Sequence, residues 1–282
     1  MSQKAADDMN FWQHLEVLRF VILRICGVIL VCMLAAFVFK DEVFSIIFAP
    51  KDPDFITYAF FDRIALLMGG TPDASSFNIE LINTGLTRQF MVHIQVALWV
   101  GIICASPYIL VELFRFISPA LYSSERKYAV GVTLTGYLMF ALGVLVCYFL
   151  IFPLTFRFLG TYQVSQQIAN LISLESYIDT LTMLSLMMGI MFELPLLGWL
   201  LAKFGLITAT LMRRYRRHAI VAILIAAAAI TPTADALTLF LVSLPIWLLY
   251  ETTILVVAKT KKISVAAYHT GTSPSHSSRA SV

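Results

Sequence analysis

Residues 20–39 read FVILRICGVILVCMLAAFVF, an apolar run that only Arg24 interrupts. A helix needs about 20 mainly apolar residues to cross the hydrocarbon core of a bilayer, so this run predicts a membrane-spanning helix. The rest of the chain has the same character. Of its 282 residues, 59% are hydrophobic and 13% are charged, and the mean hydropathy is +0.83. Soluble domains carry about 25% charged residues, so the composition excludes a water-soluble enzyme and a disordered chain.

Five further apolar runs can cross a membrane. They predict spans at about 90–111, 128–152, 178–202, 219–230 and 236–258. The last two enclose Thr231-Pro232-Thr233 and are expected to form a tight hairpin of two short spans, which a locally thinner bilayer accommodates. Residues 1–262 are therefore predicted to form one membrane domain of six helices. The tail, 263–282, is rich in Ser, Thr and His and is expected to be disordered.

The basic residues predict which side of the membrane each connection faces. Of the 20 Lys and Arg, only five lie on the side that holds the first, third and fifth connections. These five are Lys40, Lys51, Arg63, Arg88 and Arg157. The positive-inside rule then places both termini in the cytoplasm, in agreement with the even number of spans. The long outer segment, 40–88, is acidic and contains an expected interfacial helix at 43–49. The polar, mildly acidic residues before the first span lead us to expect no cleavable signal peptide.

Prolines recur inside or at the ends of the predicted spans. Pro107, Pro153, Pro195 and Pro245 each remove a backbone hydrogen bond and bend a helix. Several bends together predict a curved bundle with a concave face rather than a closed, straight bundle.

A few polar residues stand where the bilayer disfavours them. Glu193 lies near the middle of the fourth span, where a charge costs about 2.5–3.5 kcal/mol on insertion scales. It is either a protonated carboxyl that bonds a neighbouring helix or a functional polar position. His93 is expected to form a helix–helix hydrogen bond, and Arg24 can extend its guanidinium to the nearby interface.

Sequence motifs of catalysis and metal binding are absent. The chain has no HExxH and no GxSxG, and its four cysteines show no CxxC spacing. We therefore expect no catalytic residue, no metal and no cofactor, and we expect Cys26, Cys32, Cys104 and Cys147 to pack as small apolar residues. From these residues alone, a proton-coupled transporter of small solutes that uses Glu193 and an intramembrane enzyme remain as alternatives. The lack of an internal repeat and of a nucleophile–base pair disfavours them.

Four segments carry more specific patterns. They are His14-Leu15-Glu16-Val17-Leu18-Arg19, the connection Ser106–Lys127, the fourth-span stretch Phe192-Glu193-Leu194-Pro195, and Thr231–Glu251. In this order they resemble the TatC family, the receptor subunit of the twin-arginine translocase, over about residues 11–258. The family's H-L-x-E-L-R motif is matched except that Val17 occupies its second acidic position. Its first cytoplasmic loop matches at Phe116, Pro119, Leu121, Tyr122, Glu125 and Arg126.

The resemblance also covers the second half of the chain. Phe192, Glu193 and Pro195 match the family's F-E-x-P, and Leu244, Pro245, Tyr250 and Glu251 match the last span. Asp235 is placed at the aspartate that precedes this span, in a turn one residue longer than the family's. Pro50, Pro107, Pro119, Leu121, Tyr122, Pro195, Asp235 and Glu251 are the structural or functional positions that the family pattern implies.

The resemblance implies a function without catalysis. TatC-like proteins bind twin-arginine signal peptides of folded precursors and support export driven by the proton-motive force. On this basis Glu125 pairs the two arginines, Glu16 and Arg19 contribute from the N-terminal segment, and Phe116 receives the following apolar residue. Glu193 would receive polar cargo or a polar residue of a partner helix.

The resemblance implies the surroundings of the protein as well. The expected partners are small single-span subunits like TatA and TatB, other copies in an oligomeric receptor complex, and the lipid bilayer. Nucleic acid is not expected. The expected location is the bacterial inner membrane.

Overall fold

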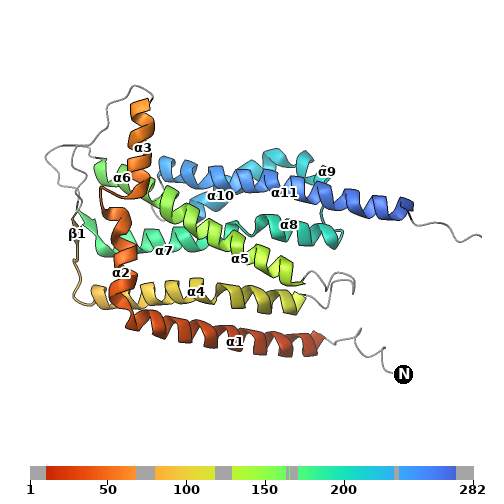
Figure 1. The fold of residues 1–282 in the computed structure, drawn as a ribbon, viewed down its shortest axis with the longest axis horizontal. Coiled ribbons are helices and arrows are strands. Elements are labelled where there is room, and N and C mark those ends of the chain that lie inside the picture. The colour runs from red at the N-terminus through yellow and green to blue at the C-terminus, as the bar shows by residue number, and fades with distance from the viewer. Residues whose placement is uncertain are drawn as a thin grey trace, which may run out of the picture.

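The structure is a computed structural model that describes residues 11–67, 80–117, 129–162, 165, 171–231 and 235–270. In these parts of the chain, long helices run roughly side by side along one direction (Figure 1). Five helical stretches are long and apolar enough to cross a membrane. They cover Leu15–Val38, Arg88–Phe116, Gly131–Thr161, Leu174–Lys203 and Ala236–Thr260. The prediction of an all-α integral membrane protein is confirmed.

The five stretches are built from continuous and interrupted helices. α1 (Phe11–Val38), α4 (Arg88–Ile117) and α11 (Ala236–Thr270) are continuous. The third stretch consists of α5 (Ala129–Val146), a π-helical turn (Cys147–Ile151) and α6 (Phe152–Thr161). The fourth consists of α7 (Leu174–Met191) and α8 (Leu194–Lys203). Pro153 and Pro195 lie in the first turns of α6 and α8, and the Phe149 carbonyl, four residues before Pro153, accepts a hydrogen bond from Thr57.

The last hairpin differs from its prediction in one respect. α10 (Arg216–Ile230) has 15 residues and corresponds to the predicted short fifth span; it is preceded by α9 (Ala209–Arg214). The expectation that the following span is also short is wrong, because α11 has 35 residues. It continues to Thr270, inside the segment expected as a tail, because no glycine or proline interrupts the sequence between Pro245 and Gly271.

Two ends of the bundle can be distinguished. The described chain begins at Phe11 and ends at Thr270 at the same end, on the right of Figure 1. We call this the basic end, because Arg19, Arg115, Lys203 and Arg216 lie on the helix segments there. At the opposite end, α2 (Lys40–Phe48) and α3 (Ile56–Leu67) run across the direction of the spans, joined by a 3₁₀ turn (Ala49–Lys51).

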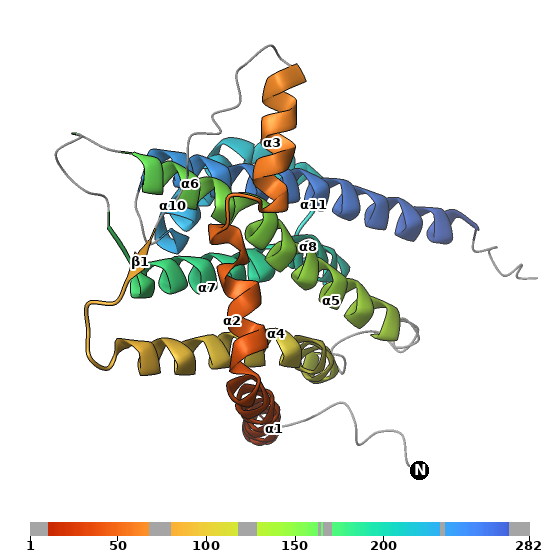
Figure 2. The ribbon, with the colours of Figure 1, turned by 60° about the vertical axis from the view of Figure 1, so that its left-hand side comes forward.

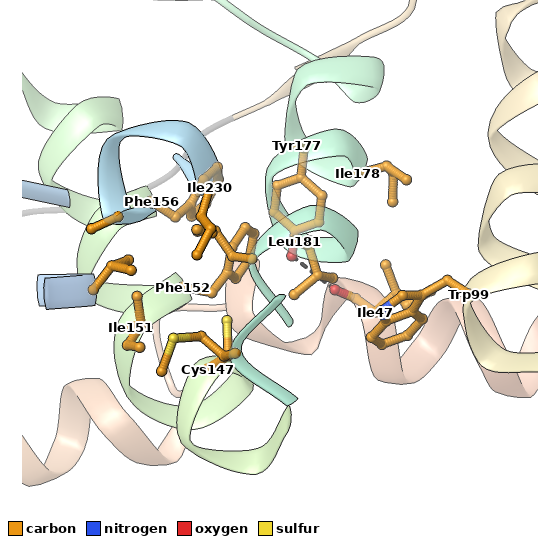
Figure 3. Packing of buried hydrophobic residues seen from close by; sticks show 14 of the residues in the cluster. Ile47, Trp99, Cys147, Ile151, Phe152, Phe156, Tyr177, Ile178, Leu181 and Ile230 are labelled. Atoms are coloured by element: carbon orange, nitrogen blue, oxygen red, sulfur yellow. Dashed lines mark hydrogen bonds between the residues drawn. The ribbon is translucent and has the colours of Figure 1, made fainter. Parts of the chain in front are cut away.

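The opposite end contains part of the main hydrophobic core. Tyr177 of α7 lies among Phe152, Phe156 and Ile47, and its hydroxyl donates a hydrogen bond to the Ile47 carbonyl at 2.8 Å (Figure 3). Strand β1 (Leu81–Ile82) pairs in parallel with β2 (Ile172–Ser173) just before α4 and α7 begin. At this end the helices are therefore held together by buried side chains and by a short pair of strands.

The cysteines occupy different environments. All four are free thiols, but only Cys147 is buried, while Cys26 and Cys104 are exposed on their helices. The prediction that all four pack in the core is wrong. In a membrane span an apolar thiol can face lipid without cost, so the hydrophobic pattern does not separate the core-facing positions from the lipid-facing ones.

Small residues set the distance between α5 and α7. A Cβ atom at Gly143 would lie 2.6 Å from the Met188 carbonyl oxygen and 2.9 Å from the Gly189 Cα, and both are backbone atoms that cannot rotate away. Close backbone approach at small residues is a common way for membrane helices to pack.

Replacing Gly143 by alanine is therefore expected to lower the thermal stability of the protein in detergent. Overpacking of this kind costs about 1–3 kcal/mol, which outweighs the roughly 0.5–1 kcal/mol that alanine gains in a helix. Gly131→Ala is the matched control on the same helix, because no atom lies within 4 Å of a Cβ there. Equal thermal midpoints for the two variants would contradict the close α5–α7 contact.

Candidate functional site

A buried carboxylate joins the first two spans near the basic end. Glu112 of α4 is 1% exposed, and its Oε1 atom lies 3.3 Å from Nη1 of Arg24 on α1 and 3.4 Å from Nη1 of Arg115. The Tyr108 hydroxyl donates a hydrogen bond to the same oxygen at 3.0 Å. Both arginines are more than half exposed, so they reach the cluster from the surface. The cluster ties α1 to α4 at a defined register.

This register places the N-terminal motif relative to the end of α4. α1 and α4 are in contact and run in opposite directions (Figure 1). With a rise of about 1.5 Å per residue, Glu16 lies about 12 Å beyond Arg24 toward the basic end, and Ile117 about 7.5 Å beyond Glu112. Glu16 is therefore about one turn beyond the end of α4, where the next connection of the chain begins. Glu16 and Arg19 are both exposed.

The other residues of the predicted peptide site are only partly described. Phe116 is half-buried in the last turn of α4. Glu125, Pro119, Leu121 and Tyr122 lie outside the described residues. The structure thus brings Glu16, Arg19 and the start of the 118–128 connection to one end of the α1–α4 pair.

A cavity of about 330 Å³ lies between α4, α5, α7 and α8 in the half of the bundle nearer the basic end. Its lining is almost entirely apolar and includes Phe114, Phe140 and Trp199. Glu193 is the only charged residue among those that line it. Since Phe114 is two residues before Phe116, the cavity approaches the place where the peptide-site residues begin.

Glu193 is positioned by the break between α7 and α8. The residue stands at the N-terminal cap of α8, directly before Leu194 and Pro195, and is 9% exposed. Its Oε1 atom is buried and has no hydrogen-bond partner in the described part of the chain. Gly136 of α5 leaves room for the carboxylate, because a Cβ there would lie 3.3 Å from Oε2. The hydrogen bond to a neighbouring helix that the sequence offered as one alternative is therefore not made by Oε1.

Pro50 and Asp235 have local structural partners. Pro50 is buried, and its carbonyl accepts a hydrogen bond from the Tyr58 hydroxyl at 2.9 Å; Tyr58 also reaches the Pro153 carbonyl at 3.2 Å. Burial raises the pKa of Tyr58, while Arg157 nearby acts in the other direction, so this hydroxyl stays a donor at neutral pH. Asp235 caps α11, since its Oδ1 accepts the Thr238 amide at 2.8 Å.

Glu251 is paired at the basic end. Its Oε2 lies 2.6 Å from Nη2 of Arg216 at the start of α10. The adjacent Tyr250 donates a hydrogen bond to the Met212 carbonyl of α9 at 2.8 Å. These two neighbouring residues hold the α9–α10 segment against α11, which explains why a charge is tolerated within a long apolar helix.

Pro107 lies in the interior of α4 and is exposed.

The polar edge of the second span makes helix-to-helix contacts. His93 Nε2 lies 3.2 Å from the Phe37 carbonyl at the end of α1, so the expected helix–helix bond is present. Gln95 donates to Asp179 Oδ1 at 2.8 Å and to Thr182 Oγ1 at 3.1 Å, both on α7. Arg88 and Glu175 form an ion pair between the same two helices.

Three polar or small positions were missed by sequence reasoning. Glu112 directly follows the second apolar run and lies three residues before Arg115. In the sequence it therefore resembles an ordinary charged residue at a helix end. Asp179 lies at the edge of a predicted span, and Gly136 is one of several glycines in apolar runs. One signal that could have suggested the pairing of Arg24 with Glu112 is their spacing from the two motifs. Arg24 follows the N-terminal motif by a few residues, and Glu112 precedes the loop motif by a similar number.

These features define a class of protein. It is an α-helical membrane protein with several spans, in which a nearly apolar cavity contains one carboxylate, Glu193, in the half of the bundle nearer the basic end. Comparison with known proteins identifies the family. The family model described as "Sec-independent protein translocase protein (TatC)" matches residues 13–245. The chain belongs to the TatC family and is a membrane component of the Sec-independent protein translocase.

Individual relatives agree with the family assignment. The chain is 32% identical over 249 residues to the TatC protein of Blattabacterium sp. subsp. Periplaneta americana (strain BPLAN), covering 87% of this chain and 93% of the relative. The TatC protein of Aquifex aeolicus (strain VF5) is 33% identical over 247 residues, with coverage of 87% and 93%.

A solved structure supports the fold. It is described as "Crystal Structure of Twin Arginine Translocase Receptor- TatC" and superposes with a TM-score of 0.71 at 32% identity. The match covers 88% of this chain and 99% of the solved chain. The family resemblance drawn from the four motifs is confirmed, and a translocase component replaces the transporter and the intramembrane enzyme as the class of protein.

Proposed function

We propose that this protein binds twin-arginine signal peptides of folded precursors at the basic end of its bundle, which faces the cytoplasm of a bacterial inner membrane. Together with small single-span subunits of the TatA and TatB kind, it would support export of these precursors by the proton-motive force. The basic residues at this end support the orientation by the positive-inside rule. The protein would work as one copy among several in a receptor complex.

The observation that carries the proposal is the Arg24–Glu112 contact between α1 and α4. It sets Glu16 and Arg19 beside the start of the connection that contains Glu125. Two carboxylates from separate segments could then approach one peptide. A guanidinium presents a planar fork of donors to a carboxylate, and such charge-assisted bonds are about twice as strong as neutral ones. Phe116, at the last turn of α4, would take the apolar residue that follows the arginine pair.

The cavity supports a second, separate contact. Glu193 is buried in apolar surroundings, and its Oε1 has no hydrogen-bond partner among the described residues, which is an unfavourable state for a carboxyl group in a membrane. A polar side chain of cargo or of a single-span partner that enters the cavity would provide the missing hydrogen bond. Signal-peptide recognition and partner contact would thus use different carboxylates on different helices.

Site-specific crosslinking tests the proposal. A photoreactive residue at position 116 is expected to crosslink a precursor whose signal peptide contains the arginine pair, and to lose the crosslink when the pair is changed to two lysines. A lysine presents a point charge rather than a fork and does not replace arginine at a bidentate site. Crosslinking that is equal for both precursors, or absent for both, would reject the proposed peptide site.

Glu193→Ala is expected to lower export of a twin-arginine reporter while crosslinking of the precursor to position 116 stays near the wild-type level. The reason is that the carboxyl group lies in the cavity and not at the ends of α1 and α4. The control is Glu42→Ala, which removes an exposed carboxyl on α2 that does not line the cavity. Loss of the position-116 crosslink in the Glu193 variant would contradict the division of roles.

A further inference from the structure

α3 is an unusual helix to find outside the spans. Its 12 residues, ITYAFFDRIALL, contain only two charged side chains, Asp62 and Arg63. It extends sideways beyond the rest of the bundle in both views (Figures 1 and 2), so the spans do not cover its far half. Exposed apolar patches on this scale commonly mark an interaction surface.

The exposed side chains form one face. Ile56, Phe60 and Leu67 are 66%, 59% and 87% exposed and recur at helical spacing, together with the exposed Arg63. Thr57 and Tyr58, on the other side of the helix, are buried. α3 therefore presents an apolar stripe with one basic residue, while its buried side holds it to the protein.

Contacts with the third span determine the position of α3 along the span direction. Thr57 donates a hydrogen bond to the Phe149 carbonyl in the π-helical turn, and Tyr58 bonds the Pro153 carbonyl at 3.2 Å. Asp62 pairs with Arg157 of α6 at 3.6 Å, so its charge is compensated. These contacts hold α3 at the outer part of the third span, crosswise to the span direction.

The surface next to α3 is itself suited to lipid. Phe149 and Leu150, on the span, are exposed, and Phe55 stacks on Phe149 with ring centroids 5.8 Å apart. The apolar surface of the span thus continues through Phe55 to the start of α3. A basic side chain such as Arg63 on an apolar helix can extend its guanidinium to phosphate headgroups while its stem stays among acyl chains.

We propose that α3 is an interfacial helix whose exposed face binds the lipid of the leaflet at this end of the bundle, the outer leaflet in the orientation proposed above. The inference depends on that orientation only for the name of the leaflet. Such helices lie with their apolar face about 5–10 Å into the boundary between headgroups and acyl chains. The helix would act as a lateral anchor for the segment that caps the spans.

The test measures the depth of α3 in full-length protein reconstituted singly in nanodiscs of phosphatidylethanolamine and phosphatidylglycerol. Cys26, Cys32 and Cys104 are changed to alanine, and the buried Cys147 is kept. One fluorescent nitrobenzoxadiazole label is placed at Leu67→Cys, at the exposed Asp54→Cys as the aqueous control, or at the exposed Leu142→Cys on α5 as the control within the membrane. Lipids with a nitroxide near the headgroup or deeper in the chain serve as quenchers.

The label at position 67 is expected to emit at shorter wavelength than the label at position 54 and to be quenched mainly by the shallow nitroxide. The label at position 142 should be quenched more by the deep nitroxide. Emission and quenching at position 67 equal to those at position 54 would show that α3 is in water and overturn the proposal. A blue-shifted emission without lipid quenching would also overturn it, because protein rather than lipid would then cover the face.

Discussion

Glu125→Lys is expected to abolish export of a twin-arginine reporter while the protein remains in the membrane at its normal level. The family resemblance implies that Glu125 accepts the guanidinium groups of the signal peptide, and a lysine there would repel them. Loss of a hydrogen bond to a charged group costs about 1.5–3 kcal/mol. Because 1.4 kcal/mol is a factor of ten, Glu125→Ala alone should weaken peptide binding about ten- to a hundredfold.

Two measurements separate this result from a folding defect. Membrane abundance and the thermal midpoint of the purified variant should equal those of the wild type, since Glu125 lies in a connection and not in a span. Glu42→Ala, an exposed carboxylate on α2 at the opposite end, should leave both peptide crosslinking and export unchanged. If crosslinking of the signal peptide stays at the wild-type level in either Glu125 variant, Glu125 is not the receptor carboxylate.

Arg24→Met is expected to loosen α1 from α4 and to reduce both stability and peptide binding. Glu112 is buried, and without Arg24 its described partners are Tyr108 and Arg115 of α4 itself, so the contact that ties α4 to α1 is lost. A hydrogen bond to a charged group contributes about 1.5–3 kcal/mol. Peptide binding should fall as well, because the same contact sets the position of Glu16 relative to the end of α4. The thermal midpoint in detergent and crosslinking from position 116 measure the two effects.

The double variant Arg24→Met/Glu112→Met makes this prediction sharper. The double variant removes the buried Glu112 carboxylate together with its partner on α1, so it should be more stable than Arg24→Met alone. Arg115→Met is the matched control, because Arg115 contacts Glu112 from within α4 and does not bridge two helices. Equal losses for Arg24→Met and Arg115→Met, or a double variant less stable than either single one, would argue against a bridging role.

The spans show how far sequence reasoning reaches. The apolar run at 20–39 predicted a helix that the structure extends to Phe11–Val38, and the run at 178–202 corresponds to α7 and α8. Bilayer thickness imposes a minimum length and apolar composition on every span, so composition alone locates it. The same reasoning missed α3, because a 12-residue stretch that contains two charged side chains is too short to span a bilayer and fits no local pattern of a membrane segment.

The candidate site was predicted only in part. Glu193 stood out from sequence because a carboxyl group in a span is rare and costly. Glu112 did not, because a glutamate close to a helix end normally reaches water. The difference lies in the neighbours: Glu112 is enclosed by α1 and α4, and its partner Arg24 is 88 residues away in the chain.

The sequence by itself determined that this protein is a six-helix membrane component of a protein translocase with more basic residues on one side, because bilayer thickness, charge asymmetry and four ordered motifs act locally along the chain. Only the tertiary structure decided that Glu112 joins α1 to α4, that Glu193 faces a cavity, and that α3 extends beyond the spans. Burial and ion pairing depend on which helix faces meet. Which helix faces meet is decided by packing between segments far apart in the chain, for example Gly143 of α5 against α7. The order of residues along the chain does not reveal this packing.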